Sequence, residues 1–253
     1  MSESIGTRRE TTLHRELKYS YTGLGGQIEV EVGGYVADGM NAGGEYIEVQ
    51  TGSFAPLRHK AREIAAQGKL RIVYPVIVNK YIEVFDNDGM RLYRRKSGKH
   101  QTPWNLFDAL VYAPELPLVR GLVIELALID AEERRVRDGK GSWRRRGISI
   151  RDRRMTALHE SICLLRPADY LRFVPFMQGE RFTSALLAKK AGISVALAAF
   201  AADSVGVFIG YLTKVAVFGD VSRFGRIVTL CALMLASVLS TIARCFTKDR
   251  HHP

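Results

Sequence analysis

The sequence predicts an α/β fold with a mixed sheet, followed by a mainly helical C-terminal region. Residues 11–67 read in order as a helix, three strands and a helix. The β-branched run at 70–78 follows, and such a run is typical of a strand buried on both faces. An apolar content of 47% is ordinary for a chain of 253 residues with a hydrophobic core. We therefore place an α/β domain in residues 1–175 and a helical region in residues 180–253.

The first helix and the first strand follow from two different periods. Leu13 and Leu17 are four residues apart and predict a helix over 11–21, with Glu16 at the edge of its apolar stripe. Residues 27–32 alternate apolar with acidic side chains, which predicts a half-buried strand.

A hairpin over residues 35–50 is the most informative stretch of the chain. Its centre contains asparagine and paired glycines, which accept the positive φ angles of a tight turn. Pairing the strands about that turn places Asp38 opposite Glu48, where Cβ atoms lie about 5 Å apart. Gln50 shares the side of the strand that Glu48 occupies, because side chains alternate with period two. Three oxygen-bearing side chains are thus expected to converge.

Hard cations favour such a group of oxygens, since Mg²⁺ takes one or two carboxylates and keeps water in its remaining positions. A bound metal ion activates water and neutralises charge on a phosphate. The alternative interpretation is structural. In that case Asp38 is a turn residue at a strand end, and Glu48 and Gln50 belong to a solvated sheet face.

The rest of the first domain is predicted as alternating helices and strands. We expect a helix over 55–67, a hairpin over 81–93, a short helix over 103–111, a strand over 119–129 and a helix over 157–165.

The charge of the chain favours a polyanionic partner. The formal net charge of +11 suits either nucleic acid or an anionic membrane surface. Residues 132–154 are rich in arginine, which binds phosphate bidentately, and an interleaved indole can stack on a base. The alternative is a mobile basic loop, because three glycines loosen this segment. The residues expected to contact DNA are Arg134, Arg135, Arg137, Trp143, Arg144, Arg145, Arg146, Arg151, Arg153 and Arg154.

Together these residues resemble a known family. Glu16 on a helix, Asp38 at a strand end, the Glu48-Val49-Gln50 strand and Lys60 on the next helix resemble the PD-(D/E)XK nuclease superfamily, whose core is an αβββαβ unit. More narrowly, residues 13–60 look like uncharacterised restriction-endonuclease-like bacterial proteins. The resemblance covers about the first half of the chain.

The resemblance implies a DNA nuclease that depends on Mg²⁺ or Mn²⁺. By this comparison Asp38 and Glu48 bind the metal ion, and Glu16 assists from the first helix. Gln50 replaces the lysine that the superfamily usually carries on that strand, so Lys60 would supply an ammonium group from the helix. Ala37 precedes Asp38, so the usual Pro-Asp pair is absent.

The C-terminal region supports three interpretations. Residues 181–194 look like the start of a winged-helix module, with Thr183 or Ser184 as helix cap and Gly192 at the turn, but the following helix lacks side chains that read bases. The apolar stretches 193–212 and 227–243 each approach the length of about 20 residues that spans a bilayer. Buried core helices would have the same composition.

Function therefore stays open between two classes. The first is a DNA endonuclease in the cytoplasm, with a possible inner-membrane anchor formed by residues 193–246. The second is a catalytically inactive nuclease-like protein that binds DNA or associates with the membrane. Cys163, Cys231 and Cys245 show no metal-binding spacing, and the polar N-terminal ten residues predict no secretory signal.

Overall fold

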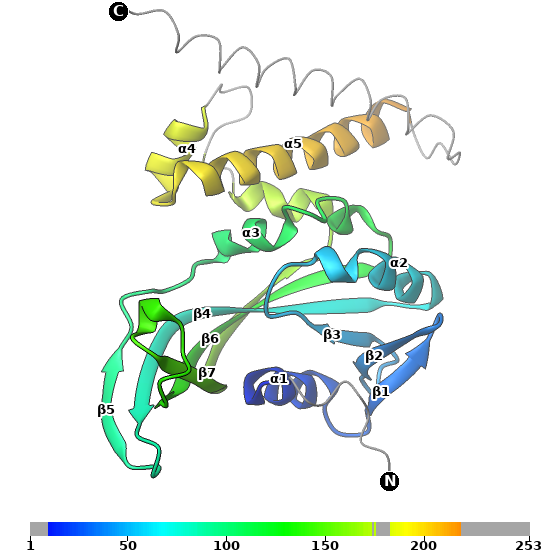
Figure 1. Cartoon of the computed structure of the whole chain (residues 1–253). Helices are drawn as coiled ribbons and strands as arrows, with labels where there is room; N and C mark the ends of the chain where they lie inside the picture. The colour runs from blue at the N-terminus through cyan, green and yellow to red at the C-terminus, as the bar shows by residue number, and fades with distance from the viewer. Residues whose placement is uncertain (1–9, 174, 176–182, 219–253) are drawn as a thin grey trace, which may run out of the picture. The chain divides into compact units, whose positions relative to one another are not determined.

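The computed structural model describes residues 10–173, 175 and 183–218, and its mixed α/β fold agrees with the predicted class (Figure 1). The chain divides into two compact units, and the boundary between them follows Leu212. The architecture below concerns the described residues before that division, apart from the last turns of the final helix.

A mixed sheet organises these residues, and seven strands of the described part belong to it. Along the sheet the order is β1-β2-β3-β4-β6-β7, and β5 pairs with β4 outside this path. β3, β4 and β6 are parallel, whereas the other neighbours are antiparallel. The strands are β1 (Gln27–Val32), β2 (Tyr35–Met40), β3 (Tyr46–Val49), β4 (Leu70–Phe85), β5 (Arg91–Lys96), β6 (Leu122–Arg137) and β7 (Ile148–Leu164).

Helices cover both faces of this sheet. α1 (Thr12–Thr22) lies on one face, while α2 (Arg58–Gln67) and α3 (Leu106–Leu110) lie on the other (Figure 1). The Thr11 side chain caps α1 by accepting from His14 N at 3.3 Å. Short 3₁₀ turns join the elements: η2 (Ala55–Leu57), η3 (Pro103–Asn105), η4 (Leu116–Leu118), η5 (Trp143–Arg145) and η6 (Pro167–Phe173).

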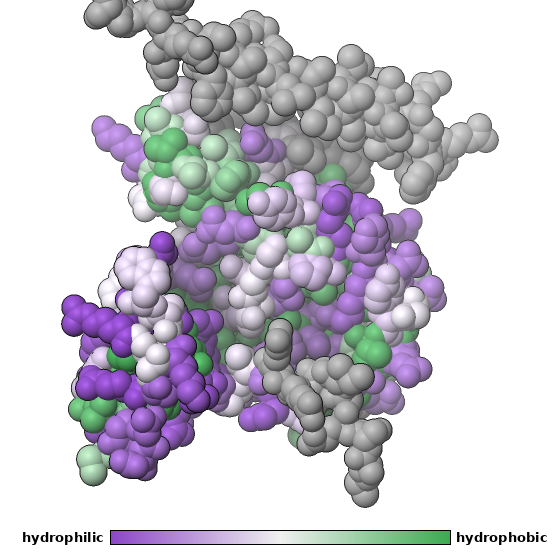
Figure 2. Space-filling view, in the orientation of Figure 1, coloured by the Kyte–Doolittle hydropathy of each residue, from purple (hydrophilic) through white to green (hydrophobic). Residues whose placement is uncertain are grey.

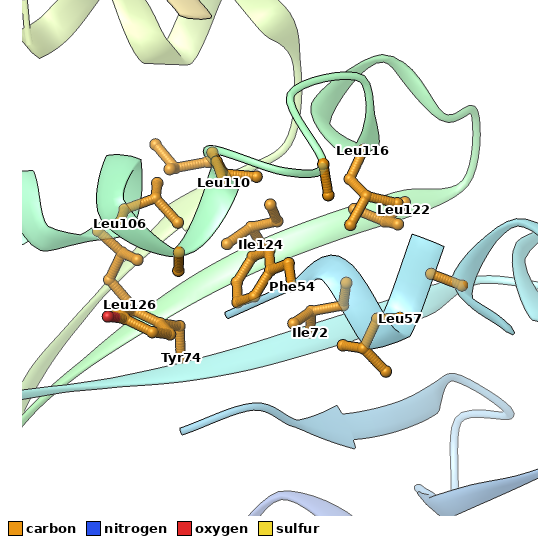
Figure 3. Close-up of a cluster of buried hydrophobic side chains, with 14 of the residues drawn as sticks. Phe54, Leu57, Ile72, Tyr74, Leu106, Leu110, Leu116, Leu122, Ile124 and Leu126 are labelled. Atoms are coloured by element: carbon orange, nitrogen blue, oxygen red, sulfur yellow. The ribbon is translucent and has the colours of Figure 1, made fainter. Parts of the chain in front are cut away.

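Two hydrophobic clusters fill the space between helices and sheet. The larger lies between β4, β6 and the α2–α3 side, where Phe54, Ile72 and Leu110 are fully buried (Figure 3). The smaller joins Leu13 and Leu17 of α1 to β3, β4 and β6. Burying one such aliphatic side chain contributes about 2 kcal/mol. The two predicted leucines therefore do anchor the first helix to the sheet.

β4 is longer than expected because it has different neighbours along its length. On one edge β4 pairs with β3 from Leu70 to Val73, and it pairs with β5 from Tyr81 onward. Pro75 lies in the interval between them, where its missing N–H leaves no strand partner unsatisfied. The other edge pairs with β6 along nearly its whole length, with one irregularity after Ile77.

The helix predicted over 157–165 is wrong, because residues 157–164 belong to β7. Pairing with the long strand β6 overrides the weak helical preference of this stretch. Register shifts next to Leu128, Asp130 and Arg134 break the two-residue alternation that would have revealed a strand. β7 is also largely exposed, so few of its positions carry an apolar signal.

The arginine-rich segment is likewise not a loose loop over most of its length. Its first part belongs to β6 and its last part to β7, and the connection is closed by a hydrogen bond of 3.0 Å from Gly141 N to Gly147 O. A Cβ at Gly141 would lie 2.0 Å from the Ile148 carbonyl oxygen, so only glycine fits there.

Buried ion pairs hold this β6–β7 hairpin together. Glu133 is 1% exposed; it accepts from Arg153 Nε at 2.8 Å and also pairs with Arg135. Lys80 Nζ lies 3.7 Å from the same carboxylate. Burial opposes ionisation, but these cations outweigh it and lower the pKa of Glu133. A polar sequence forms two long strands here because its charges are satisfied across strands.

The C-terminal elements are α4 (Ser184–Ala191) and α5 (Val195–Phe218). As predicted, Thr183 caps α4, with its Oγ1 accepting from Leu186 N at 3.2 Å, and Gly192 ends it with φ of +66°. Along α5, an apolar stripe joins the larger core cluster, which accounts for part of its hydrophobic composition. That stripe consists of Leu197, Ala201 and Val205.

Among the described residues, no individual helix meets the length and hydropathy needed to cross a bilayer. Ser184–Ala191 and Val195–Gly206 meet them only when taken together, and they are bent by 109° at the break between them. The apolar segment predicted at 227–243 lies outside the described residues. Residues 219–246 of the proposed 193–246 anchor also lie outside them.

Replacing Glu133 by glutamine should destabilise the fold by about 3 kcal/mol at pH 7, because it leaves buried cations unpaired. The folded-state pKa of Glu133 is lowered, so its contribution is present above the ordinary pKa and is lost as the pH falls through the folded one. Urea unfolding from pH 7 to pH 3 measures this difference, which should shrink toward low pH. Glu31→Gln, at an exposed position of β1, is the control; equal stability of both variants would contradict the prediction.

Candidate functional site: a fork between two strands

The predicted meeting of Asp38 and Glu48 is present, and it occurs where β2 separates from β3. Their ladder ends at the pair Gly39 and Ile47. Beyond it, side chains replace backbone partners: the Asp38 carboxylate accepts from Val49 N at 2.8 Å, and the Glu48 carboxylate accepts from Asp38 N at 3.2 Å. These reciprocal bonds fix both acids at the fork between the strands.

Gly39 allows this fork to form beneath the end of α1. A Cβ at this position would lie 2.3 Å from Thr22 Oγ1 and 2.9 Å from the Gln27 carbonyl oxygen. Neither contact is possible for a larger residue without moving α1 or β1. The residue next to Asp38 is therefore restricted to glycine by close packing.

Lys60 of α2 reaches Glu48. Its ammonium nitrogen lies 2.6 Å from Glu48 Oε1, and the Glu48 residue is only 3% exposed. Burial, followed by the negative charge of Asp38, raises the pKa of Glu48, and Lys60 opposes this rise. The buried acid is thus held beside one negative and one positive group.

His14 of α1 reaches the other acid. Its Nε2 lies 3.3 Å from Asp38 Oδ2, and its Nδ1 lies 2.8 Å from Glu10 Oε1. Lys18 Nζ in turn lies 2.9 Å from Glu10 Oε1. The helix therefore extends the site into a chain of alternating charges.

This chain of charges shifts the pKa of His14 and the pKa of Asp38, the two groups that meet at the fork. Burial favours neutral imidazole, but the carboxylates of Asp38 and Glu10 outweigh burial and raise the pKa of His14. Burial likewise opposes ionised Asp38, but His14, the Val49 N–H and Lys60 lower the pKa of that acid. Asp38 is accordingly the acid that keeps its charge, while Glu48 is the one that resists ionisation.

His14 was not predicted from the sequence as a member of this site. The signal available was the spacing of Glu10, His14 and Lys18, each four residues from the next. Residues four apart share one face of a helix, so an acid, a histidine and a lysine at that spacing form a charged row.

The structure separates Glu16 and Gln50 from the expected convergence. Glu16 Oε2 accepts from Met155 N of β7 at 2.7 Å, so this carboxylate ties α1 to a strand at the edge of the sheet. The Gln50 amide donates to the Ser53 carbonyl oxygen. Asp38, Glu48 and Lys60 come together, whereas these two side chains have other partners.

The arginine-rich segment divides into engaged and available side chains. Arg135 and Arg153 pair with Glu133, Arg154 with Glu132, and Arg151 with Asp138. The remaining arginines of the predicted DNA-binding set have no ion pair among the described residues. They are Arg134, over the Phe85 ring; Arg144, over Trp143; Arg145, which donates to the Ile148 carbonyl; and Arg137 and Arg146.

The donor set limits which metal ion the fork suits. Within the described ranges, no group of three or more His, Cys, Asp or Glu side chains is arranged to hold a metal ion. That finding disfavours an all-protein cage of the kind that structural zinc or calcium sites use. Mg²⁺ needs less, since one or two carboxylates suffice when water and a substrate phosphate complete its shell. Asp38 and Glu48 fit that requirement.

Comparison with known proteins gives a family but no activity. The family model described as "Domain of unknown function (DUF8091)" matches residues 11–165, which run from the cap of α1 to just past β7. An "Uncharacterized protein" of Treponema pallidum (strain Nichols) is 30% identical over 158 residues, covering 62% of this chain and 63% of that protein. The chain therefore spans less than two thirds of that relative's length. No solved structure matches the chain.

Lys60 and Glu48 should be energetically coupled. Lys60→Met leaves a buried carboxylate beside Asp38 without its ammonium partner, so it should cost about 2–3 kcal/mol at pH 8. Adding Glu48→Gln should recover about 1–2 kcal/mol relative to the sum of the single changes. Chemical unfolding of the three variants completes the cycle.

Arg62→Met is the matched control on the same helix. Arg62 pairs with Glu115 at 3.1 Å on the surface, where such a pair contributes less than about 1 kcal/mol. Strict additivity of Lys60→Met and Glu48→Gln would show that the ion pair at the fork is not formed.

Proposed function

The chain belongs to the DUF8091 family, a family defined without an assigned activity, and we propose that this member is a divalent-metal-dependent DNA endonuclease. The observation that carries the proposal is the buried Glu48 beside Asp38, with the Lys60 ammonium 2.6 Å from it. Two acids and one lysine are the donor set of the PD-(D/E)XK superfamily. The element order α1-β1-β2-β3-α2-β4 matches the order that the superfamily resemblance implies.

Each side chain at the fork has a distinct task in this proposal. Asp38 and Glu48 hold Mg²⁺ or Mn²⁺, and His14 orients the Asp38 carboxylate through Nε2. A bound ion supplies a Lewis acid that activates water and neutralises charge on the phosphodiester. Lys60 would supply from the helix the ammonium group that the superfamily usually supplies from the strand, where this chain has Gln50. Its positive charge stabilises the extra negative charge that develops on the phosphate during hydrolysis.

DNA contact in this proposal comes from the basic hairpin of β6 and β7. Arginines without an ion partner among the described residues are the ones free to exchange counterions for phosphates. Arg134, Arg137, Arg144 and Arg146 belong to that group. Arg135, Arg151, Arg153 and Arg154 instead stabilise the hairpin that presents them.

A catalytically inactive DNA-binding protein is the second candidate. It is favoured by the contacts of Gln50, whose amide is engaged by Ser53, and by the presence of a cation on each acid. In this case the charges at the fork only stabilise the fold. A nuclease-like fold does not by itself establish activity.

Cleavage assays distinguish the two candidates. Supercoiled, linear, single-stranded and branched DNA are incubated with the full chain and Mg²⁺ or Mn²⁺. The proposal predicts metal-dependent nicking or cutting that falls at least about a hundredfold in Asp38→Asn and in Glu48→Gln, because each removes a carboxylate that holds the metal ion.

Glu31→Gln is the control, since it changes an exposed glutamate on the same sheet and should keep full activity. Cleavage that survives both fork substitutions would reject the assigned site. DNA binding without cleavage of any form under either metal would favour the second candidate.

A further inference from the structure

A basic cavity of about 560 Å³ lies at the end of the sheet that carries β5. It is formed by β4, β5, the segment 97–99, β6, the turn η5 and β7. Figure 2 shows hydrophilic side chains gathered over β5 and the neighbouring strand ends. The cavity is built from different residues than the fork at Asp38.

The charges lining this cavity are strongly unbalanced. Seven positive side chains face a single acid, Glu133, among the described residues that line it. Lys80, Arg135 and Arg153 share that acid. The other four cations have no ion pair within the described part of the chain. They are Arg95, Lys99, Arg144 and Arg145.

The lowered pKa of Lys80 reflects this excess positive charge. Burial lowers the pKa of Lys80, and Arg153, Arg135 and Lys99 lower it further, while Glu133 opposes the shift. These cations repel one another strongly, because the site is partly shielded from water. A bound anion would relieve that repulsion and stabilise the charged form of Lys80.

Two features indicate the kind of anion. Arginine side chains bind the oxygens of phosphate through paired N–H donors, and the volume lies in the range of about 300–1,000 Å³ typical of small-molecule sites. Trp143, next to the lining residue Arg144, is 83% exposed. The Arg144 guanidinium carbon lies 5.5 Å from the centroid of the Trp143 ring, so this exposed indole is close to a lining residue and offers a stacking surface for a base.

We infer that this cavity binds a phosphate monoester, supplied by the terminal phosphate of a nucleic-acid strand whose last base stacks on Trp143. The inference deepens the proposed DNA function but does not require cleavage. It assigns Lys80, Arg95 and Lys99, which lie outside the arginine-rich segment, to the same binding surface as Arg144 and Arg145.

Fluorescence anisotropy tests this inference without catalysis. The full chain carrying Asp38→Asn is titrated, in chelator, into labelled single-stranded oligonucleotides that differ only in a phosphate or hydroxyl at the 5′ or the 3′ end. At least one phosphorylated end should bind about tenfold tighter than its hydroxyl counterpart, because the terminal phosphate accepts charge-assisted hydrogen bonds from the lining arginines. Arg95→Ala combined with Lys99→Ala should reduce the preference to less than about twofold.

Lys69→Ala combined with Arg120→Ala is the matched control, because it removes one lysine and one arginine at exposed positions outside the cavity. This variant should keep the preference for the phosphorylated end. Pyrophosphate is titrated separately to identify a free source of the same group.

Each outcome decides the inference. A preference lost only in the Arg95/Lys99 variant supports a nucleic-acid end as the ligand. Equal binding of both ends, with pyrophosphate binding that the same variant abolishes, supports the phosphate site with a free polyphosphate as its source. Absence of both effects, or their persistence in that variant, overturns the inference. None of these readings depends on whether the fork cleaves DNA.

Discussion

The structure around the candidate site depends on one constraint, which is that two acids at a strand fork need compensating charges from both layers of helices. Asp38 and Glu48 satisfy the backbone where β2 and β3 separate. His14 on α1 then compensates one acid, and Lys60 on α2 the other. A buried carboxylate without such a partner would cost several kcal/mol, so the placement of both helices and the geometry of the fork are linked.

The same principle operates at the other end of the sheet, where cations again compensate buried acids. Glu132 and Glu133 are buried acids surrounded by arginines, and their pairs allow a highly charged sequence to form the long strands β6 and β7. There, however, cations exceed acids, and part of the positive charge has no partner among the described residues. The two carboxylates at the fork are ligands suited to a divalent cation, and the excess of basic side chains at the hairpin suits phosphate. Under the proposed function, a phosphodiester substrate and a divalent metal ion would connect the two regions chemically.

Local patterns were sufficient to predict much of the fold. Alternation in residues 27–32 and the four-residue spacing of Leu13 and Leu17 gave the first strand and helix, and turn residues gave the hairpin that brings Asp38 to Glu48. β7 was missed because its register shifts and exposure remove the two-residue period, and only its pairing with β6 makes it a strand. His14 was missed because its role depends on how α1 docks. The partners of Glu16 and Gln50 are likewise tertiary contacts that spacing does not reveal.

Metal binding at the fork tests the central claim most directly. Mn²⁺ titrated into the full chain, and followed by calorimetry or by the spin-resonance signal of the free ion, should show a site that weakens at least about tenfold in Asp38→Asn and in Glu48→Gln but not in Glu31→Gln. A loss of that size corresponds to about 1.4 kcal/mol for one carboxylate ligand. Wild-type protein that binds no Mn²⁺, or binding that both fork substitutions leave unchanged, would contradict the account.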